Sequence, residues 1–159
     1  MNLYEYELSE VCKRLSSGKN IKARDVYEHG KFPVYGGNGL RGYADSANFD
    51  GDCAIIGRQG AYCGNVRFFS GAAYMTEHAV VVQANEQNNT RYLAYLLSTM
   101  DLGRLSGQSA QPGLSVKVLG QQKILLPVKG IQDKIASVLA ILDKKILVNE
   151  EINRNLQAA

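Results

Sequence analysis

One stretch of the sequence decides the fold: GQSAQPGLS (107–115), followed by ILLP (124–127) and IQDKI (131–135). A polar, glycine-containing segment leads into a short apolar run, which predicts a strand, and a proline ends that strand. From residue 131 onward, apolar residues recur at helical spacing as far as residue 156. At 3.6 residues per turn, this pattern predicts a single helix of about seven turns.

The predicted helix carries an apolar stripe that resembles an interface. The residues near the a and d positions of a heptad form this seam: Ile131, Ile135, Val138, Leu142, Asn149, Ile152 and Leu156. Lys145 interrupts the seam, while Leu139 and Ile146 widen the apolar stripe. A helix of this length would overhang so small a domain, so we expect it to bind a second chain. Packing against its own globular domain is the alternative.

The bulk properties indicate one folded domain. The chain has 159 residues, of which 45% are hydrophobic, enough to bury a core. It contains no apolar run of transmembrane length and no signal peptide, which favours the cytoplasm and no membrane partner. The odd number of cysteines, Cys12, Cys53 and Cys63, favours reduced core thiols over a disulfide or a metal site.

Basic residues are concentrated near the N-terminus, although the net charge is only +3. The segment 12–31 contains Lys13, Arg14, Lys19, Lys22, Arg24 and Lys31. A local excess of this kind suits a phosphate backbone, and it equally suits an ordinary solvated loop.

The apolar and glycine patterns predict most of the remaining elements. We expect strands at 4–8, 32–35, 53–56, 65–69, 79–82 and 123–126, with Gly42–Ala44 beginning another. Pro33 restricts its strand to an edge or to a strand start. Turns are expected at 36–39, 50–52 and 57–62. One or two helical turns are expected at 9–15 and an amphipathic helix at 90–100, with a short helical or irregular link at 114–117.

Motifs for enzymatic chemistry are missing from the sequence. It has no Asn-Pro-Pro-aromatic motif for adenine methylation and no phosphate-binding GxxxxGK[ST] loop. Neither His29 nor His78 has neighbours with metal-ligand spacing, and His78 suits a hydrogen-bonded structural role. We therefore expect no catalytic residues, no metal and no cofactor.

Four blocks of sequence, in this order and spacing, resemble the specificity (S) subunits of Type I restriction-modification enzymes. They are GKFPVYGGNGLRGY (30–43), IIGRQG (55–60) with GNV (64–66), TEHAVV (76–81), and the opening stretch continued by Asp143, Ile146 and Asn149. The resemblance implies an α+β fold. Residues 1–128 would form a small target recognition domain with a twisted, largely antiparallel sheet. Residues 129–159 would form a long conserved helix for dimerisation, spacing and methyltransferase docking.

The same resemblance implies a non-catalytic subunit that reads double-stranded DNA. Its partners would be methyltransferase subunits and, through them, a restriction subunit. Glycine-rich turns let a backbone approach DNA closely, and Arg, Gln and Asn can read base edges. The candidate DNA-binding residues are Lys22, Arg24, Asn38, Arg41, Arg58, Gln59, Tyr62 and Gln111.

The chain departs from the family in its size. A usual S subunit has two recognition domains and two such helices, whereas this chain has one of each. It is either a half-subunit that dimerises or a fragment of a longer chain. Two other functions stay open: a scaffold that does not read DNA, and a small cytosolic hydrolase with an unrecognised site.

Overall fold

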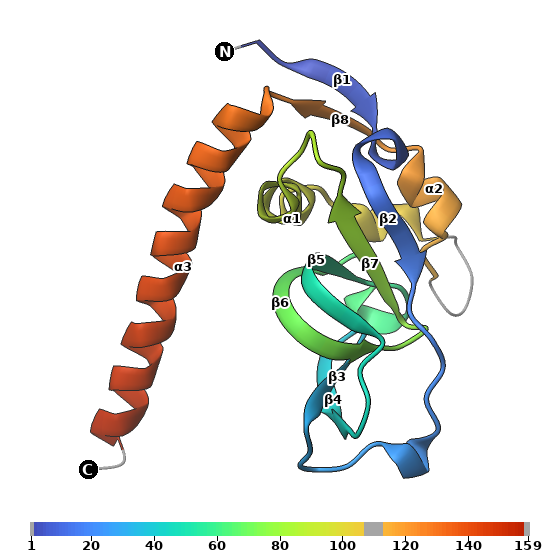
Figure 1. Cartoon of the computed structure of the whole chain (residues 1–159), viewed down its shortest axis with the longest axis vertical. Coiled ribbons are helices and arrows are strands. Elements are labelled where there is room, and N and C mark those ends of the chain that lie inside the picture. Colours follow the sequence, from blue (N-terminus) through green and yellow to red (C-terminus); the bar gives the residue numbers. More distant parts are fainter. Residues whose placement is uncertain (1, 107–112, 158–159) are drawn as a thin grey trace.

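The computed structural model describes residues 2–106 and 113–157 (Figure 1). The strands are β1 (Tyr4–Glu7), β2 (Cys12–Ser17), β3 (Phe32–Gly36), β4 (Gly39–Ala44), β5 (Phe49–Gly57), β6 (Val66–Met75), β7 (Ala79–Ala84) and β8 (Lys123–Leu126). The α-helices are α1 (Thr90–Ser98), α2 (Val116–Gly120) and α3 (Lys129–Gln157). Short 3₁₀ helices lie at Leu8–Val11, Ala23–Asp25, Gly60–Tyr62 and Leu102–Leu105.

The sheet topology confirms the expected α+β class. The main sheet has the strand order β2-β7-β5-β6-β3-β4, and β1 and β8 form a separate antiparallel pair. Only β3 and β6 run parallel; the other neighbours in the main sheet are antiparallel. The largely antiparallel sheet and the long C-terminal helix are therefore as the sequence predicts.

Two hydrophobic clusters, one on each face of the central strands, explain the continuous apolar runs in β5 and β7. Ala54 and Ile56 belong to one cluster, which α1 and α2 cover with residues such as Leu97 and Leu119. Cys53 and Ile55 belong to the other cluster, together with residues of β6. Because neighbouring side chains in a strand point to opposite faces, a strand buried on both faces has no polar alternation.

The turn expected at 50–52 was wrong, because these residues continue β5. Asp50, Gly51 and Asp52 pair with Ala72, Gly71 and Ser70 of β6 in a long antiparallel hairpin. Gly51 (φ +120°) and Gly71 (φ +123°) lie directly opposite one another. Positive φ in both strands at the same level disfavours other residues there, so a glycine signal typical of turns lies within a paired region.

The N-terminal segment also differs from the expectation. Of the one or two helical turns expected at 9–15, a single 3₁₀ turn (Leu8–Val11) forms, and it leads directly into β2, which pairs with β7. Gly42–Ala44 ends β4 rather than beginning a strand. Pro33 lies near the start of β3 and before the residues that pair with β6, Val34 and Tyr35, so it removes no donor from that ladder.

Helix α3 begins against the domain and then leaves it. Gln132 and Ala136 are buried, whereas every described residue from Ile141 onward is exposed. Figure 1 shows the helix slanting away from the sheet toward its C-terminal end. Within the described residues, no helix combines the length and the apolarity needed to cross a bilayer.

Candidate nucleic-acid interface

Three backbone turns meet at one end of the sheet. A Cβ on Gly37, in the β3–β4 turn, would lie 3.0 Å from the carbonyl oxygen of His78. A Cβ on Gly57, at the end of β5, would lie 2.6 Å from the carbonyl oxygen of Gly37. These approaches leave no room for side chains, which explains the glycines in the blocks at 30–43 and 55–60. The turns therefore form one continuous surface.

Asn38 and Arg58 lie on this surface. Asn38 is exposed at the tip of the β3–β4 turn. The backbone N–H of Arg58 donates to the carbonyl oxygen of His78 at 2.9 Å, and its Nη1 donates to Ser17 Oγ at 3.3 Å. Two backbone and side-chain contacts thus hold a half-buried arginine at the junction of β2, β5 and β7.

Gln59 and the first residues after position 112 also meet here. Gln59 is exposed and pairs with Gly113 in an isolated antiparallel bridge. The N–H of Leu114 donates to the carbonyl oxygen of Arg58 at 2.8 Å. The proposed site residue Gln111 lies outside the described residues.

Arg67 is a further member that the sequence pattern did not single out. It is exposed on β6, and its Nη2 donates to the carbonyl oxygen of Asn38 at 3.5 Å. Arg41 is exposed on β4, with its aliphatic stem against Gly36. The antiparallel pairing of β5 with β6 places Arg67 here, and only a register known in advance would have revealed it.

We name Asn38, Arg41, Arg58, Gln59 and Arg67 the arginine surface. Within residues 2–106 and 113–157, none of its three guanidinium groups forms an ion pair with a carboxylate. Guanidinium groups without a carboxylate partner are free to bind phosphate or the O6 and N7 atoms of guanine. Exposed amides beside them can pair with adenine.

The remaining DNA-binding candidates lie apart from the arginine surface or at its edge. Tyr62 is 45% exposed in the 3₁₀ turn that follows Gln59. Lys22 is exposed and lines, with Tyr74, a hollow of about 400 Å³ at the open end of the β3–β4 hairpin, and Arg24 is exposed in the 3₁₀ turn that follows. Arg24 Nε lies 3.8 Å from Asp25 Oδ1. The structure thus does not bring these two cations to the turns around Asn38.

The seam of α3 is exposed over most of its length. Val138 (59%), Leu142 (51%), Ile152 (49%) and Leu156 (72%) keep about half or more of their surface, and Asn149 is exposed. Ile131 and Ile135 are half-buried near the domain. At about 100° per residue, the seam lies on a different side of the helix from Gln132 and Ala136, which face the domain. Ile141 and Val148, which the heptad pattern omits, extend the exposed apolar stripe.

The cysteines and histidines show no catalytic arrangement in the described residues. Burial raises the pKa of Cys12 and of Cys53 to about 12, so both thiols stay protonated. All three cysteines are free, and no group of three or more potential metal ligands occurs in the part of the chain that the structure describes. His78 Nε2 lies 3.2 Å from Glu77 Oε1, beside the arginine surface.

Comparisons with known proteins agree on one family. The profile of the family described as "Type I restriction modification DNA specificity domain" matches residues 2–158. The specificity subunit of the Escherichia coli Type I restriction enzyme EcoprrI is 40% identical over 141 residues, which cover 86% of this chain and 34% of that protein. A putative Type I specificity subunit of Mycoplasma pneumoniae is 28% identical over 148 residues, covering 89% of this chain and 39% of that protein.

Structural comparison gives the same fold. The S subunit of a Type I restriction-modification system from M. genitalium superposes with a TM-score of 0.84 at 18% identity, over 98% of this chain and 43% of that one. The HsdS subunit from Thermoanaerobacter tengcongensis superposes with a TM-score of 0.66 at 14% identity, over 92% and 38%. The chain spans between a third and a half of the length of these relatives. It belongs to the family of Type I restriction-modification DNA specificity domains.

Proposed function

We propose that this chain is a non-catalytic module that reads the sequence of double-stranded DNA for a Type I restriction-modification enzyme. The observation that carries the proposal is the arginine surface: three guanidinium groups without carboxylate partners, from β4, β6 and the segment after β5, beside closely packed glycine turns. The matching proteins are named as specificity subunits, which supports the same role here.

The arginine surface offers two kinds of contact to DNA. Arg41, Arg58 and Arg67 can make bidentate contacts to guanine, and Asn38 and Gln59 can do so to adenine. Lys22 and Arg24, at the other end of the β3–β4 hairpin, suit phosphates that flank the bases being read. Phosphate contacts position the module, and base contacts select the sequence.

We also propose that two copies pair antiparallel through the seam of α3. The support for this pairing is the exposed apolar seam, in which Val138, Leu142, Ile152 and Leu156 keep about half or more of their surface. About a two-fold axis, the seam matches itself in pairs: Ile131 with Leu156, Ile135 with Ile152, Val138 with Asn149, and Leu142 with Lys145. Such a dimer would hold two identical DNA-reading domains at opposite ends and dock methyltransferase subunits, which in turn would bind a restriction subunit.

Salt-dependent binding to duplex DNA tests the reading function. For a module that neutralises phosphates, the logarithm of the DNA-binding constant falls linearly with the logarithm of the salt concentration. A scaffold or a hydrolase that does not bind DNA shows no such slope. The purified chain should not turn over S-adenosylmethionine or ATP and should not cleave DNA. Absence of any DNA binding at low salt, with the methyltransferase present or absent, would contradict the proposal.

A further inference from the structure

The start of α3 is held to the domain by one buried polar side chain. Gln132 is 1% exposed, and its Oε1 accepts from the backbone N–H of Asn89 at 2.9 Å. Its Nε2 donates to Asn88 Oδ1 at 2.8 Å and to the carbonyl oxygen of Pro127 at 2.9 Å. Both donors and the acceptor are used, so this amide fixes the first turn of α3 to the 85–89 turn in rotation as well as in position.

Asn89 joins this contact to helix α1. Its Oδ1 caps α1 by accepting from the N–H of Tyr92 at 2.8 Å, while its Nδ2 donates to Asp133 Oδ1 at 2.7 Å. The carboxylate of Asp133 therefore lies near the N-terminal end of α1, where a negative charge is favourable. Lys129 Nζ adds a hydrogen bond to the carbonyl oxygen of Glu86 at 2.8 Å. One amide thus couples the direction of α3 to that of α1.

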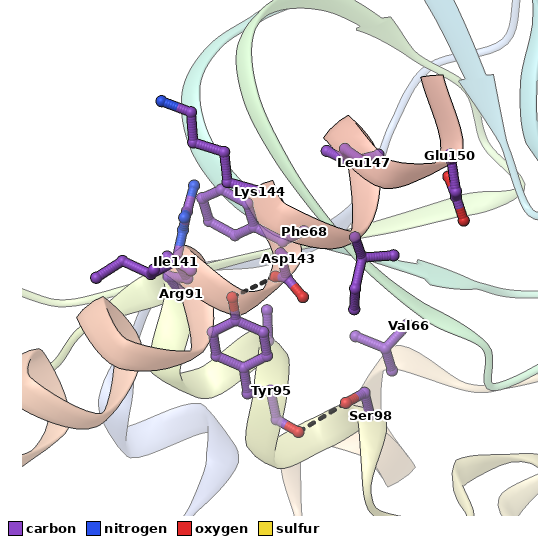
Figure 2. A pocket seen from close by; sticks show the side chains of 13 residues that line it. Val66, Phe68, Arg91, Tyr95, Ser98, Ile141, Asp143, Lys144, Leu147 and Glu150 are labelled. Carbon is purple, nitrogen blue, oxygen red and sulfur yellow. Dashed lines mark hydrogen bonds between the residues drawn. The ribbon is translucent and has the colours of Figure 1, made fainter. Parts of the chain in front are cut away.

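A second polar contact holds α3 further along its length. The hydroxyl of Tyr95 on α1 donates to Asp143 Oδ2 across the groove shown in Figure 2. The groove has a volume of about 860 Å³ and lies between α1, β6 and α3. Asp143 lies eleven positions after Gln132, so the two contacts are about 16 Å apart along the helix axis.

Two separated contacts fix the direction of the α3 axis relative to the domain, whereas a single contact would let the helix rotate about that point. Burial, and then the hydrogen bond to Asp143, raise the pKa of Tyr95 to about 12, so the donor stays protonated well above physiological pH. Beyond Asp143, no hydrogen bond in the described residues joins a side chain of α3 to the domain. The part of α3 after Asp143, which we call the lever, therefore projects from the domain at an angle that these two contacts set.

We propose that Gln132 and the Tyr95–Asp143 pair are positioning residues that determine which spacing between two DNA half-sites the protein accepts. This inference rests on the proposed function, in which α3 connects two DNA-reading domains. In B-DNA, each added base pair moves a half-site by about 3.4 Å and rotates it by about 35°. If the lever angle is fixed, the protein can bind half-sites at only a few spacings. If the angle varies, it can bind half-sites at more spacings. Spacing selectivity would then reside in residues that do not touch DNA.

A spacer series tests the proposal directly. Duplexes carrying the selected half-site twice, with the spacer varied one base pair at a time, are titrated with wild-type chain and variants. The double variant Gln132→Leu with Tyr95→Phe should lower spacer discrimination from about tenfold per base pair to about threefold or less. Binding to a single half-site should stay as in the wild type. The control, Ser98→Ala with Glu150→Gln, changes two residues lining the same groove and should keep the wild-type preference.

The single variant Tyr95→Phe keeps the test decisive if the double variant does not fold. It removes a partly exposed hydroxyl and retains the ring, so it should relax spacing on its own with the fold intact. If this variant and the double variant both retain wild-type discrimination, the proposal is wrong. If the wild type binds no duplex at all, the proposed DNA-reading function is wrong. That result differs from wild-type binding with unchanged spacer discrimination in the variants, which contradicts only the positioning role.

A measurement without DNA checks the lever itself. Nitroxide labels on unnatural side chains at Lys31 and Glu151, both exposed, report the distance between domain and helix tip. Dilution with unlabelled chain makes each distance intramolecular. Pulsed electron paramagnetic resonance should give a narrow distribution for the wild type and the control, and a broadened one for the double variant. An unchanged distribution in the double variant would overturn the positioning role.

Discussion

The guanidinium of Arg58 donates a hydrogen bond to the hydroxyl oxygen of Ser17 at 3.3 Å. This contact joins the arginine that follows β5 to the last residue of β2. It restricts the directions in which the guanidinium group of Arg58 can point. A restricted arginine loses less conformational entropy when it binds a base.

Replacing Arg58 with Ala should relax sequence choice at one position of the target, at a cost of about 1–3 kcal/mol in cognate binding. Arg58→Lys keeps the charge but loses the bidentate fork, so it should restore general affinity without restoring selectivity. Ser17→Ala should have a smaller effect in the same direction. Binding titrations on cognate and single-substituted duplexes measure all three. Unchanged discrimination in Arg58→Ala would remove this residue from the reading surface.

Lys22 and Arg24 should act on all sequences alike. Replacing either with Ala removes an exposed cation beside the open end of the β3–β4 hairpin and should reduce the salt slope by about 1. The preferred sequence should not change. Lys134→Ala, which removes the same charge from an exposed position of α3, is the control and should leave the slope as it is. Equal slopes in all variants would show that these cations do not contact phosphate.

The seam of α3 should carry self-association. Changing Leu142 and Ile152 together to Asp places charges where the proposed interface excludes water, which should give monomers. The control, Ser137→Asp with Asn155→Asp, adds the same charges to exposed positions outside the seam. Light scattering at tens of micromolar distinguishes these states. A monomeric wild type, or a seam variant that still dimerises, would contradict the pairing.

The Tyr95–Asp143 contact predicts a pH dependence of stability. The pKa of Tyr95 rises from its ordinary 10.0 to about 12 on folding, so the folded chain holds this proton more tightly than the unfolded chain. The stabilisation is fully present below pH 10 and is lost as the pH rises toward 12. The difference in unfolding free energy between wild type and Tyr95→Phe should therefore be constant below pH 10 and shrink above it. Denaturant titrations across this range measure it, and a difference that grew with pH would contradict the assignment.

The elements that the sequence predicted well are those in which local pattern and tertiary burial agree. Cys53–Ile56 and Ala79–Val82 are apolar runs that become the central strands β5 and β7, and the long periodic pattern becomes α3. Within residues 9–15, the helical structure ends at Val11, because Cys12–Ser17 pairs with β7 and that pairing outweighs local preference. The Asp50–Asp52 turn was misassigned because an aligned pair of glycines serves a bent hairpin as readily as a turn.

The candidate site was predictable only where glycine turns mark it. Asn38, Arg58 and Gln59 follow such turns, and the structure brings these three together. Arg67 lies in an ordinary strand sequence and joins the surface only through the β5–β6 register. The hydrogen bonds from Gln132 to Asn88 and Asn89 join residues more than forty positions apart, so no local sequence pattern predicts them.

Selection from a pool of random duplexes tests the central claim most directly. The chain is purified, mixed with the pool at moderate salt, with and without its methyltransferase, and the retained duplexes are sequenced. A homodimer with a DNA-reading domain at each end of a helix about 43 Å long should enrich an interrupted palindrome, its half-sites about one helical turn apart. Retention of duplexes with no common sequence, or of none above background, would contradict the account.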